Sequence, residues 1–210
     1  MIQIPVLVFA RYLRNRRTYG LKQVKHTEKK ENQIPFKYYR SAIAAITRYH
    51  RSGNDHTEFK KAREKLTLSL ASCEKPGKAV IIRNNLRAIA NYQMHFGNRV
   101  FEVRPVPHLK LLVANVVISA KVDLHVLENG KPLLIKLDMC KAKQNEVEVD
   151  TILAITAEAA KTEGLHINAE CILMLRVEDG SESPGRELRP AEFSHVYEAS
   201  LQIEGAWEGL

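Results

Sequence analysis

Two aspartates and two lysines lie on either side of a tight-turn signal. The dipeptide Asn129–Gly130 favours a type I′ turn, which joins two antiparallel strands and fixes their register. In that register Asp123 faces Lys136, and Lys121 faces Asp138, on one face of the hairpin. The sequence therefore predicts a cluster of four charged side chains, two of each sign.

Such a cluster could hold a divalent metal ion. Diagonal cross-strand positions lie about 7–8 Å apart at the backbone, so the carboxylates of Asp123 and Asp138 could reach one ion between them. Mg²⁺ and Mn²⁺ prefer carboxylate oxygens, water and phosphate oxygens as ligands. Water bound to such an ion becomes a nucleophile near neutral pH, and Lys136 could orient it or stabilise the developing charge.

The same residues also fit a purely structural interpretation. Two cross-strand ion pairs would each contribute roughly 0.2–1 kcal/mol. His125 shares this face; it could serve as a further ligand or base, although a half-exposed histidine without such a role is the more common case. Residue types alone leave both interpretations open.

The elements that must position the cluster follow from apolar periodicity. Apolar residues at steps of two predict strands, and at steps of three and four they predict helices. Asn145 has the type of a helix N-cap, and Gly97 and Gly164 have the type of C-terminal caps. The predicted order is a helix over 78–95, strands over 100–103, 109–126 (broken near Ala114–Asn115) and 133–139, a helix over 145–162, a strand over 171–177, a loop over 178–186 and a helix over 190–201.

The first part of the chain is predicted to be mostly helical. Residues 4–14 form a short helix or strand, and 15–35 form a polar, basic loop. Amphipathic patterns predict helices over 36–51 and 56–72, with a break at Pro76–Gly77. The fold class is therefore α/β (α+β) with a mixed central sheet, because hairpins join the early strands and a crossover helix joins the last one.

This order of elements, with Asp123 on one strand and a charged triplet on the next, resembles the PD-(D/E)xK nuclease superfamily, the restriction-endonuclease-like fold. The resemblance covers residues 78–177, a little under half the chain, as a helix, three strands, a helix and a strand (αβββαβ). The strand that should carry (D/E)-x-K has Lys136 at the acid position and Asp138 at the lysine position, so the charges are exchanged.

The resemblance implies a domain organisation and a reaction. Residues 1–77 would be a helical basic region packed on a nuclease-like α/β core over 78–210. The implied reaction is phosphodiester hydrolysis, with Asp123, Lys136 and Asp138 as catalytic residues and with Mg²⁺ or Mn²⁺ bound by the two aspartates. The alternative is a catalytically inactive nuclease-like subunit that binds nucleic acid or a partner protein within a larger complex.

The charge distribution favours a polyanionic partner. Residues 1–100 carry 21 Lys+Arg and 6 Asp+Glu, a net charge of +15, whereas residues 101–210 have a net charge of −7. Nucleic acid is the commonest partner of such a basic half, with DNA favoured over RNA; a solvated surface or an acidic protein partner are the alternatives. The predicted nucleic-acid contacts are Lys121, Arg83, Arg87, Lys141 and Lys143. Tyr38, Tyr39 and Tyr49 could stack on bases, although core packing is favoured for Tyr39 and Tyr49.

Other features restrict the class of protein. No apolar run of roughly 18 residues predicts a membrane span, and the basic residues after the apolar start are in the wrong order for a secretory signal. Three widely spaced cysteines favour a reducing, cytoplasmic location over a disulfide framework. Cys140 has no fixed histidine or acid beside it that would make it a nucleophile. Motifs of P-loop ATPases, zincins and α/β-hydrolases do not occur. A homo-oligomer is compatible with the sequence.

Overall fold

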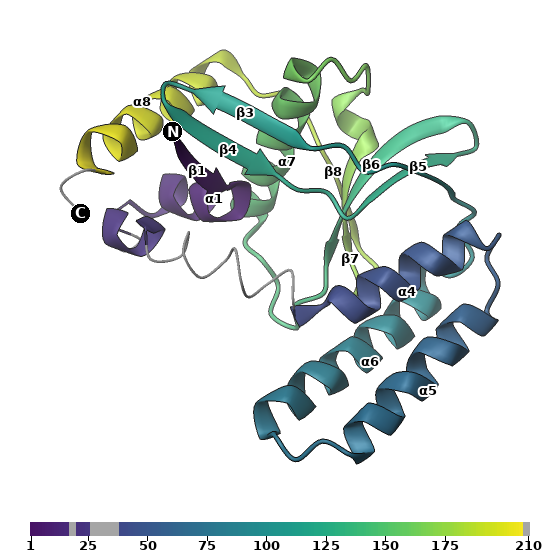
Figure 1. Cartoon of the computed structure of the whole chain (residues 1–210). Coiled ribbons are helices and arrows are strands. Elements are labelled where there is room, and N and C mark those ends of the chain that lie inside the picture. The colour runs from purple at the N-terminus through teal and green to yellow at the C-terminus, as the bar shows by residue number, and fades with distance from the viewer. Residues whose placement is uncertain (17–19, 26–37, 208–210) are drawn as a thin grey trace.

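The protein combines α and β structure with two mixed sheets, as a computed structural model of the chain shows (Figure 1). The structure describes residues 1–16, 20–25 and 38–207. The elements are β1 (Ile2–Pro5), α1 (Val6–Arg14), α4 (Arg40–Arg51), α5 (Thr57–Ala71), α6 (Pro76–Phe96), β2 (Glu102–Arg104), β3 (Leu109–Val113), β4 (Val116–Ala120), β5 (Leu124–Glu128), β6 (Lys131–Asp138), α7 (Glu146–Thr162), the 3₁₀ helix η1 (Ala169–Cys171), β7 (Ile172–Arg176), β8 (Glu182–Pro184) and α8 (Pro190–Trp207).

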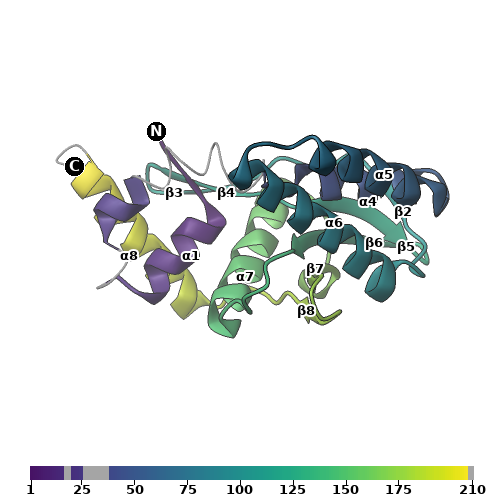
Figure 2. The same cartoon turned by 90° about the horizontal axis from the view of Figure 1, so that it is seen from below.

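The larger sheet has the strand order β2-β5-β6-β7-β8. Neighbouring strands are antiparallel except β6 and β7, which are parallel because the crossover helix α7 joins them. Helices α4 and α6 share a hydrophobic core with one face of this sheet, and α7 lies on the other side (Figure 2). Strand β6 is therefore buried on both faces, as a central strand of such a sheet must be.

The smaller sheet has the order β1-β4-β3 and packs with α1, α7 and α8 around a second core. Strand β1 runs parallel to β4, so the first residues of the chain complete a sheet that is otherwise a hairpin. The segment over 4–14, predicted as a helix or a strand, contains the end of strand β1 and the whole of helix α1. Helix α5 packs on α6, and together they extend away from the sheets (Figure 1).

The predicted hairpin and its register are confirmed. Asn129 and Gly130 have φ values of 51° and 78°, as a type I′ turn requires. Glu128 pairs with Lys131, and the apolar pairs Val126–Leu133 and Leu124–Ile135 face each other as expected. The break near Ala114–Asn115 is also confirmed, because it separates β3 from β4.

The hairpin ladder is shorter than predicted. It ends at the pair Leu124–Ile135, so the predicted pairing of residues 121–123 with residues 136–138 is not part of the ladder. The reason is that β4 belongs to the other sheet, and residues 121–123 carry the chain from one sheet to the next. On the same face of β6 as Lys136 and Asp138, Leu134 lies fully buried in the core formed with α7.

The helices largely follow the predictions. Helix α6 begins at Pro76, where a break was expected, because proline without its N–H is well suited to the first helical turn. Asn145 caps α7 by accepting a hydrogen bond from the Val147 N–H. The predicted loop over 178–186 contains the short strand β8, and α8 is longer than predicted. Of the predicted loop over 15–35, residues 21–25 are helical and most of the rest lies outside the described residues.

Within the described part of the chain, none of the helices combines the length and apolar character needed to cross a bilayer.

Candidate functional site

A cleft of about 700 Å³ lies where the two sheets meet the start of α4 and one side of α6. Its walls are mainly apolar, but six of the predicted functional residues line it. These are Lys121 and Asp123 from the crossing between the sheets, Lys136 and Asp138 from β6, Lys141 from the loop after β6, and Arg87 from α6. The structure therefore brings together most of the residues that the sequence singled out.

Asp123 is half-buried at the start of the hairpin. Its Oδ2 accepts a hydrogen bond of 2.7 Å from the backbone N–H of Leu137, while its own N–H donates to the carbonyl of Ile135. The Asp123 side chain thus accepts the Leu137 N–H beyond the point where the β5–β6 ladder ends. Burial raises the pKa of Asp123, although the Lys136 charge and the Leu137 N–H act in the opposite direction.

Lys136 extends from β6 into the same cleft. Its Nζ donates a hydrogen bond of 3.1 Å to the backbone carbonyl of Lys121. Within the described residues no ion pair joins Lys136 to Asp123, so the predicted direct pair is wrong. The Lys136 ammonium still lowers the pKa of the Asp123 carboxyl through space. Lys121 itself is exposed at the edge of the cleft.

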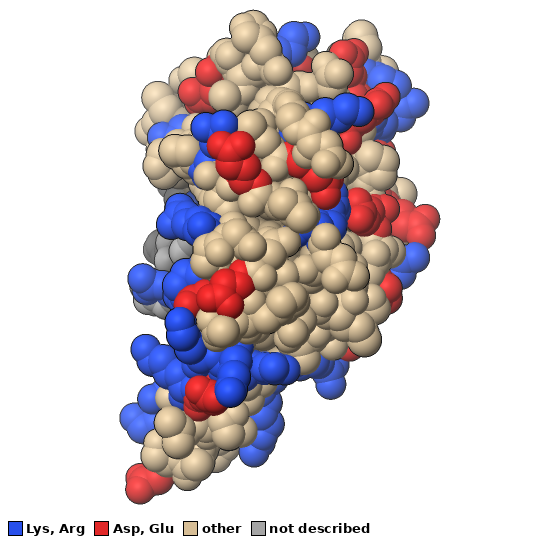
Figure 3. All heavy atoms as spheres, turned by 90° about the vertical axis from the view of Figure 1, so that its right-hand side faces the viewer, with Lys and Arg blue, Asp and Glu red and all other residues tan. Residues whose placement is uncertain are grey.

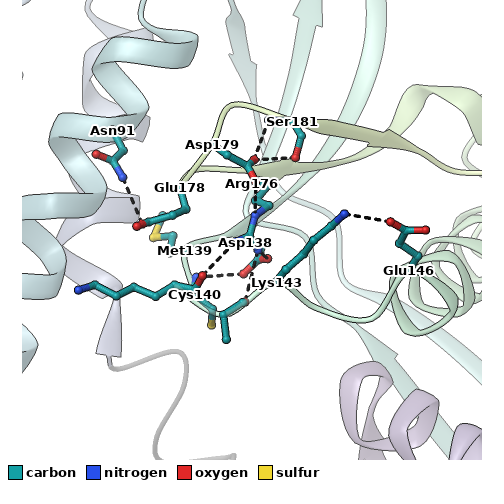
Figure 4. A network of polar contacts seen from close by, with 12 residues as sticks. Asn91, Asp138, Met139, Cys140, Lys143, Glu146, Arg176, Glu178, Asp179 and Ser181 are labelled. Carbon is teal, nitrogen blue, oxygen red and sulfur yellow. Dashed lines mark hydrogen bonds and ion pairs between the residues drawn. The ribbon is translucent and has the colours of Figure 1, made fainter.

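Asp138 pairs with an arginine from the neighbouring strand instead of with Lys121, so the predicted Lys121–Asp138 pair is wrong. The parallel register places Asp138 beside Arg176, whose Nη1 lies 3.2 Å from Oδ2 (Figure 4). The other carboxylate oxygen accepts the N–H of Cys140 at 3.0 Å. Burial raises the pKa of Asp138, and the Cys140 N–H and Arg176 partly offset this effect.

The loop after β6 is held by arginines. Arg176 donates to the backbone carbonyls of Lys141 and Ala142 at 3.0 and 3.3 Å, and also to Asp179 at 2.7 Å. On the other side, Arg87 donates to the carbonyl of Met139. The backbone of this loop is therefore held from both sides.

The other predicted nucleic-acid contacts have different environments. Arg87 forms an ion pair of 3.2 Å with Glu178, so its positive charge is partly compensated within the protein. Arg83 is exposed on α6 but does not line the cleft. Lys143 pairs with Glu146 at 2.9 Å and lines adjacent hollows instead of the cleft. The Nδ1 of His125 is hydrogen-bonded to the carbonyl of Pro105, so this residue has a structural partner.

Two residues of the site were not found from the sequence. Arg176 was missed because its partner depends on which strand lies beside β6 and in what register. Asn84 was missed because its spacing on α6 gives no functional signal; its Nδ2 donates a hydrogen bond of 2.6 Å to the Tyr38 hydroxyl at the cleft wall. An arginine at the end of a strand that follows a crossover helix is the only sequence signal that could have pointed to Arg176.

The donor set of the cleft does not match a two-carboxylate metal site as it stands. Both oxygens of Asp138 have partners, one of them the Arg176 guanidinium, and one oxygen of Asp123 is bonded to the backbone. Three lysines in the same cleft add positive charge. A cation would have to displace Arg176 from Asp138, and like charges disfavour such an exchange.

No protein-family model matches the chain, and a search of curated proteins finds no match either.

Proposed function

We propose that this protein binds nucleic acid through the cleft, on a nuclease-like core. The observation that carries the proposal is the balance of charge in the cleft. Three lysines, Lys121, Lys136 and Lys141, line it together with two aspartates, Asp123 and Asp138, and Arg176 pairs with Asp138. A site with this balance favours an anion, and the phosphate backbone supplies most of the affinity in nucleic-acid binding.

The topology supports the nuclease-like part of the proposal. When β3 and β4 are set aside, α6 is followed by strands β2, β5 and β6, helix α7 and strand β7, which gives a helix, three strands, a helix and a strand. This is the order that the resemblance to the PD-(D/E)xK superfamily implied. The hairpin β3–β4 is then an insertion, which joins β1 in the second sheet.

The exposed surface of the helices α4, α5 and α6 supports nucleic acid as the proposed partner. Lysines and arginines gather over the lower part of the molecule, where these helices lie, and acidic residues are mixed with basic ones over the upper part (Figure 3). The exposed basic residues of these helices, together with Lys75, which precedes α6, are Arg40, Arg48, Arg51, Lys60, Lys61, Arg63, Lys65, Lys75, Lys78 and Arg83.

Metal-dependent hydrolysis of phosphodiester bonds is the second candidate function. The observation that favours it is that Asp123 and Asp138 line one cleft together with Lys136. Because Arg176 pairs with Asp138, we place this activity second. A cytoplasmic subunit that binds nucleic acid without cleaving it is the form of the proposal that agrees best with the contacts.

Binding is tested by fluorescence anisotropy with labelled DNA and RNA over a series of salt concentrations. We expect the affinity to fall steeply with salt, and Lys136→Ala to reduce the slope by about 1, as the loss of one phosphate contact predicts. Lys131→Ala is the matched control, because Lys131 is an exposed lysine of the same strand outside the cleft. Absence of binding, or equal effects of the two variants, would contradict the proposal.

Cleavage is tested in parallel with Mg²⁺, Mn²⁺ or EDTA, using the Asp123→Ala and Asp138→Ala variants. Metal-dependent cleavage that is lost in both variants would make hydrolysis the function. Binding without cleavage that both variants retain would leave a nucleic-acid-binding protein.

A further inference from the structure

We propose that the cleft takes an unpaired nucleotide of a single strand, with its base stacked on Tyr38. This inference rests on the proposed function and specifies the form of nucleic acid that the site accepts. A pocket of several hundred Å³ has the size that encloses a small organic molecule, and the cleft of about 700 Å³ lies in that range. One or two nucleotides are of this size, whereas paired bases in a duplex have their faces covered by their neighbours.

The walls of the cleft have the chemistry of a nucleotide. Apolar side chains from the start of the chain, including Val6 and Leu7, line the cleft together with Lys121, Lys136 and Lys141. An apolar wall suits the face of a base, and the ammonium groups suit the phosphate that follows it. A small anion alone would not need the apolar wall.

Tyr38 differs from the other tyrosines of this region. Tyr39 and Tyr49 pack in the core formed with α6, whereas Tyr38 is half-buried and belongs to neither hydrophobic core. Its ring is thus not needed for core packing, and it lines the cleft. An aromatic ring that a core does not use can serve as a stacking surface for a base.

The position of Tyr38 is nevertheless fixed from three directions. The Asn84 side chain donates to its hydroxyl at 2.6 Å, and the Asn85 side chain donates to its backbone carbonyl at 2.6 Å. The Tyr39 ring packs edge-on against it, with 5.0 Å between the ring centroids. A ring held in place before binding loses little conformational freedom when a base stacks on it.

The test compares an oligonucleotide with its duplex of the same sequence by anisotropy, with DNA and RNA arms. We expect the single strand to bind more tightly than the duplex. Tyr38→Leu should weaken binding of the single strand by roughly 5- to 150-fold, the range for loss of one base–aromatic stack. Tyr38→Phe keeps the ring and should retain most of the affinity, and Tyr197→Leu, an exposed tyrosine on α8, serves as the control.

Strands in which every position is abasic provide a second readout, which shows whether Tyr38→Leu binds weakly only because it is misfolded. If the base stacks on Tyr38, strands whose positions are all abasic should bind the wild type and Tyr38→Leu equally. Tighter binding of the duplex, or equal affinity of the Leu and Phe variants for the intact strand, would overturn this inference while leaving the proposed function standing. Absence of binding to every nucleic acid would overturn both.

Discussion

The ion pair between Arg176 and Asp138 should be one of the most sensitive points of the fold. Their side chains are only 11% and 4% exposed, so removal of the guanidinium leaves a carboxylate with little access to water. Breaking a buried ion pair by removing one partner costs about 3–5 kcal/mol. For Arg176→Met we expect a loss of this size, which is a large part of the roughly 5–15 kcal/mol of a typical domain.

The loss should also depend on pH in a defined direction. Burial already raises the pKa of Asp138 above its usual value, and Arg176 opposes that rise. Removing Arg176 therefore raises the pKa further. A carboxyl whose pKa is higher in the folded state destabilises the fold when it is ionised, and this penalty disappears as the pH falls through the folded-state pKa. The variant should be most destabilised near neutral pH and approach the wild type in acid.

The assay is urea unfolding followed by far-UV circular dichroism at neutral and acidic pH. Arg189→Met is the matched control, because Arg189 also pairs with a carboxylate but is 70% exposed, and such pairs contribute about 0–1 kcal/mol. The double variant Asp138→Asn with Arg176→Met should recover part of the stability. If Arg176→Met costs no more than Arg189→Met, or costs the same at both pH values, the argument from burial is refuted.

Two further predictions concern local structure. Asn145→Ala should lower the free energy of unfolding by about 1 kcal/mol, because it removes the cap on the Val147 N–H; Asn168→Ala, which removes no side-chain cap, should have little effect in the same urea titration. Gly130→Ala should cost about 1–2 kcal/mol in thermal unfolding because of its positive φ, whereas Gly77→Ala, in a helix with open space around it, should be neutral or stabilising; equal effects would contradict the strain argument.

Local signals in the sequence predicted the hairpin well. The Asn129–Gly130 turn and the alternation of apolar residues determine the register together, because a shift of one residue would expose the apolar face. The end of the ladder depends on more distant contacts. Strand β4 leaves the hairpin because it pairs with β1, more than a hundred residues earlier, and no local pattern reports such a pairing.

The same reasoning explains which parts of the site could be predicted. Lys136 and Asp123 line the same cleft because both lie just beyond the last pair of the hairpin ladder, Leu124–Ile135, so their spacing from the turn carries the information. Asp138 meets Arg176 because β6 and β7 are parallel neighbours, and the register of a crossover unit depends on how α7 packs. Strand β8 was missed because its three residues, Glu182–Pro184, have the composition of a turn.

The contrast between a basic and an acidic half of the chain has a different meaning in the folded protein. Many acids of the second half pair with arginines of either half, as in Glu148 with Arg11 and Arg14, and Glu128 with Arg99. These pairs neutralise much of the acidic half. The exposed basic residues Lys60, Arg63, Lys65, Lys75, Lys78 and Arg83 form no ion pair within the described part of the chain.

The described basic residues without an ion pair include two on α6, the helix that also lines the cleft. Along α6, Arg87 lines the cleft, Arg83 lies about one turn before it, and Lys78 lies about 14 Å from Arg87 at 1.5 Å per residue. A strand with one base in the cleft would leave along this helix, where its next phosphates meet exposed cations. If so, affinity should rise with strand length until the oligonucleotide reaches the start of α6 and then level off, and Lys78→Ala should weaken only the longer strands. Equal affinity of short and long strands would refute this path while leaving the cleft itself as the binding site.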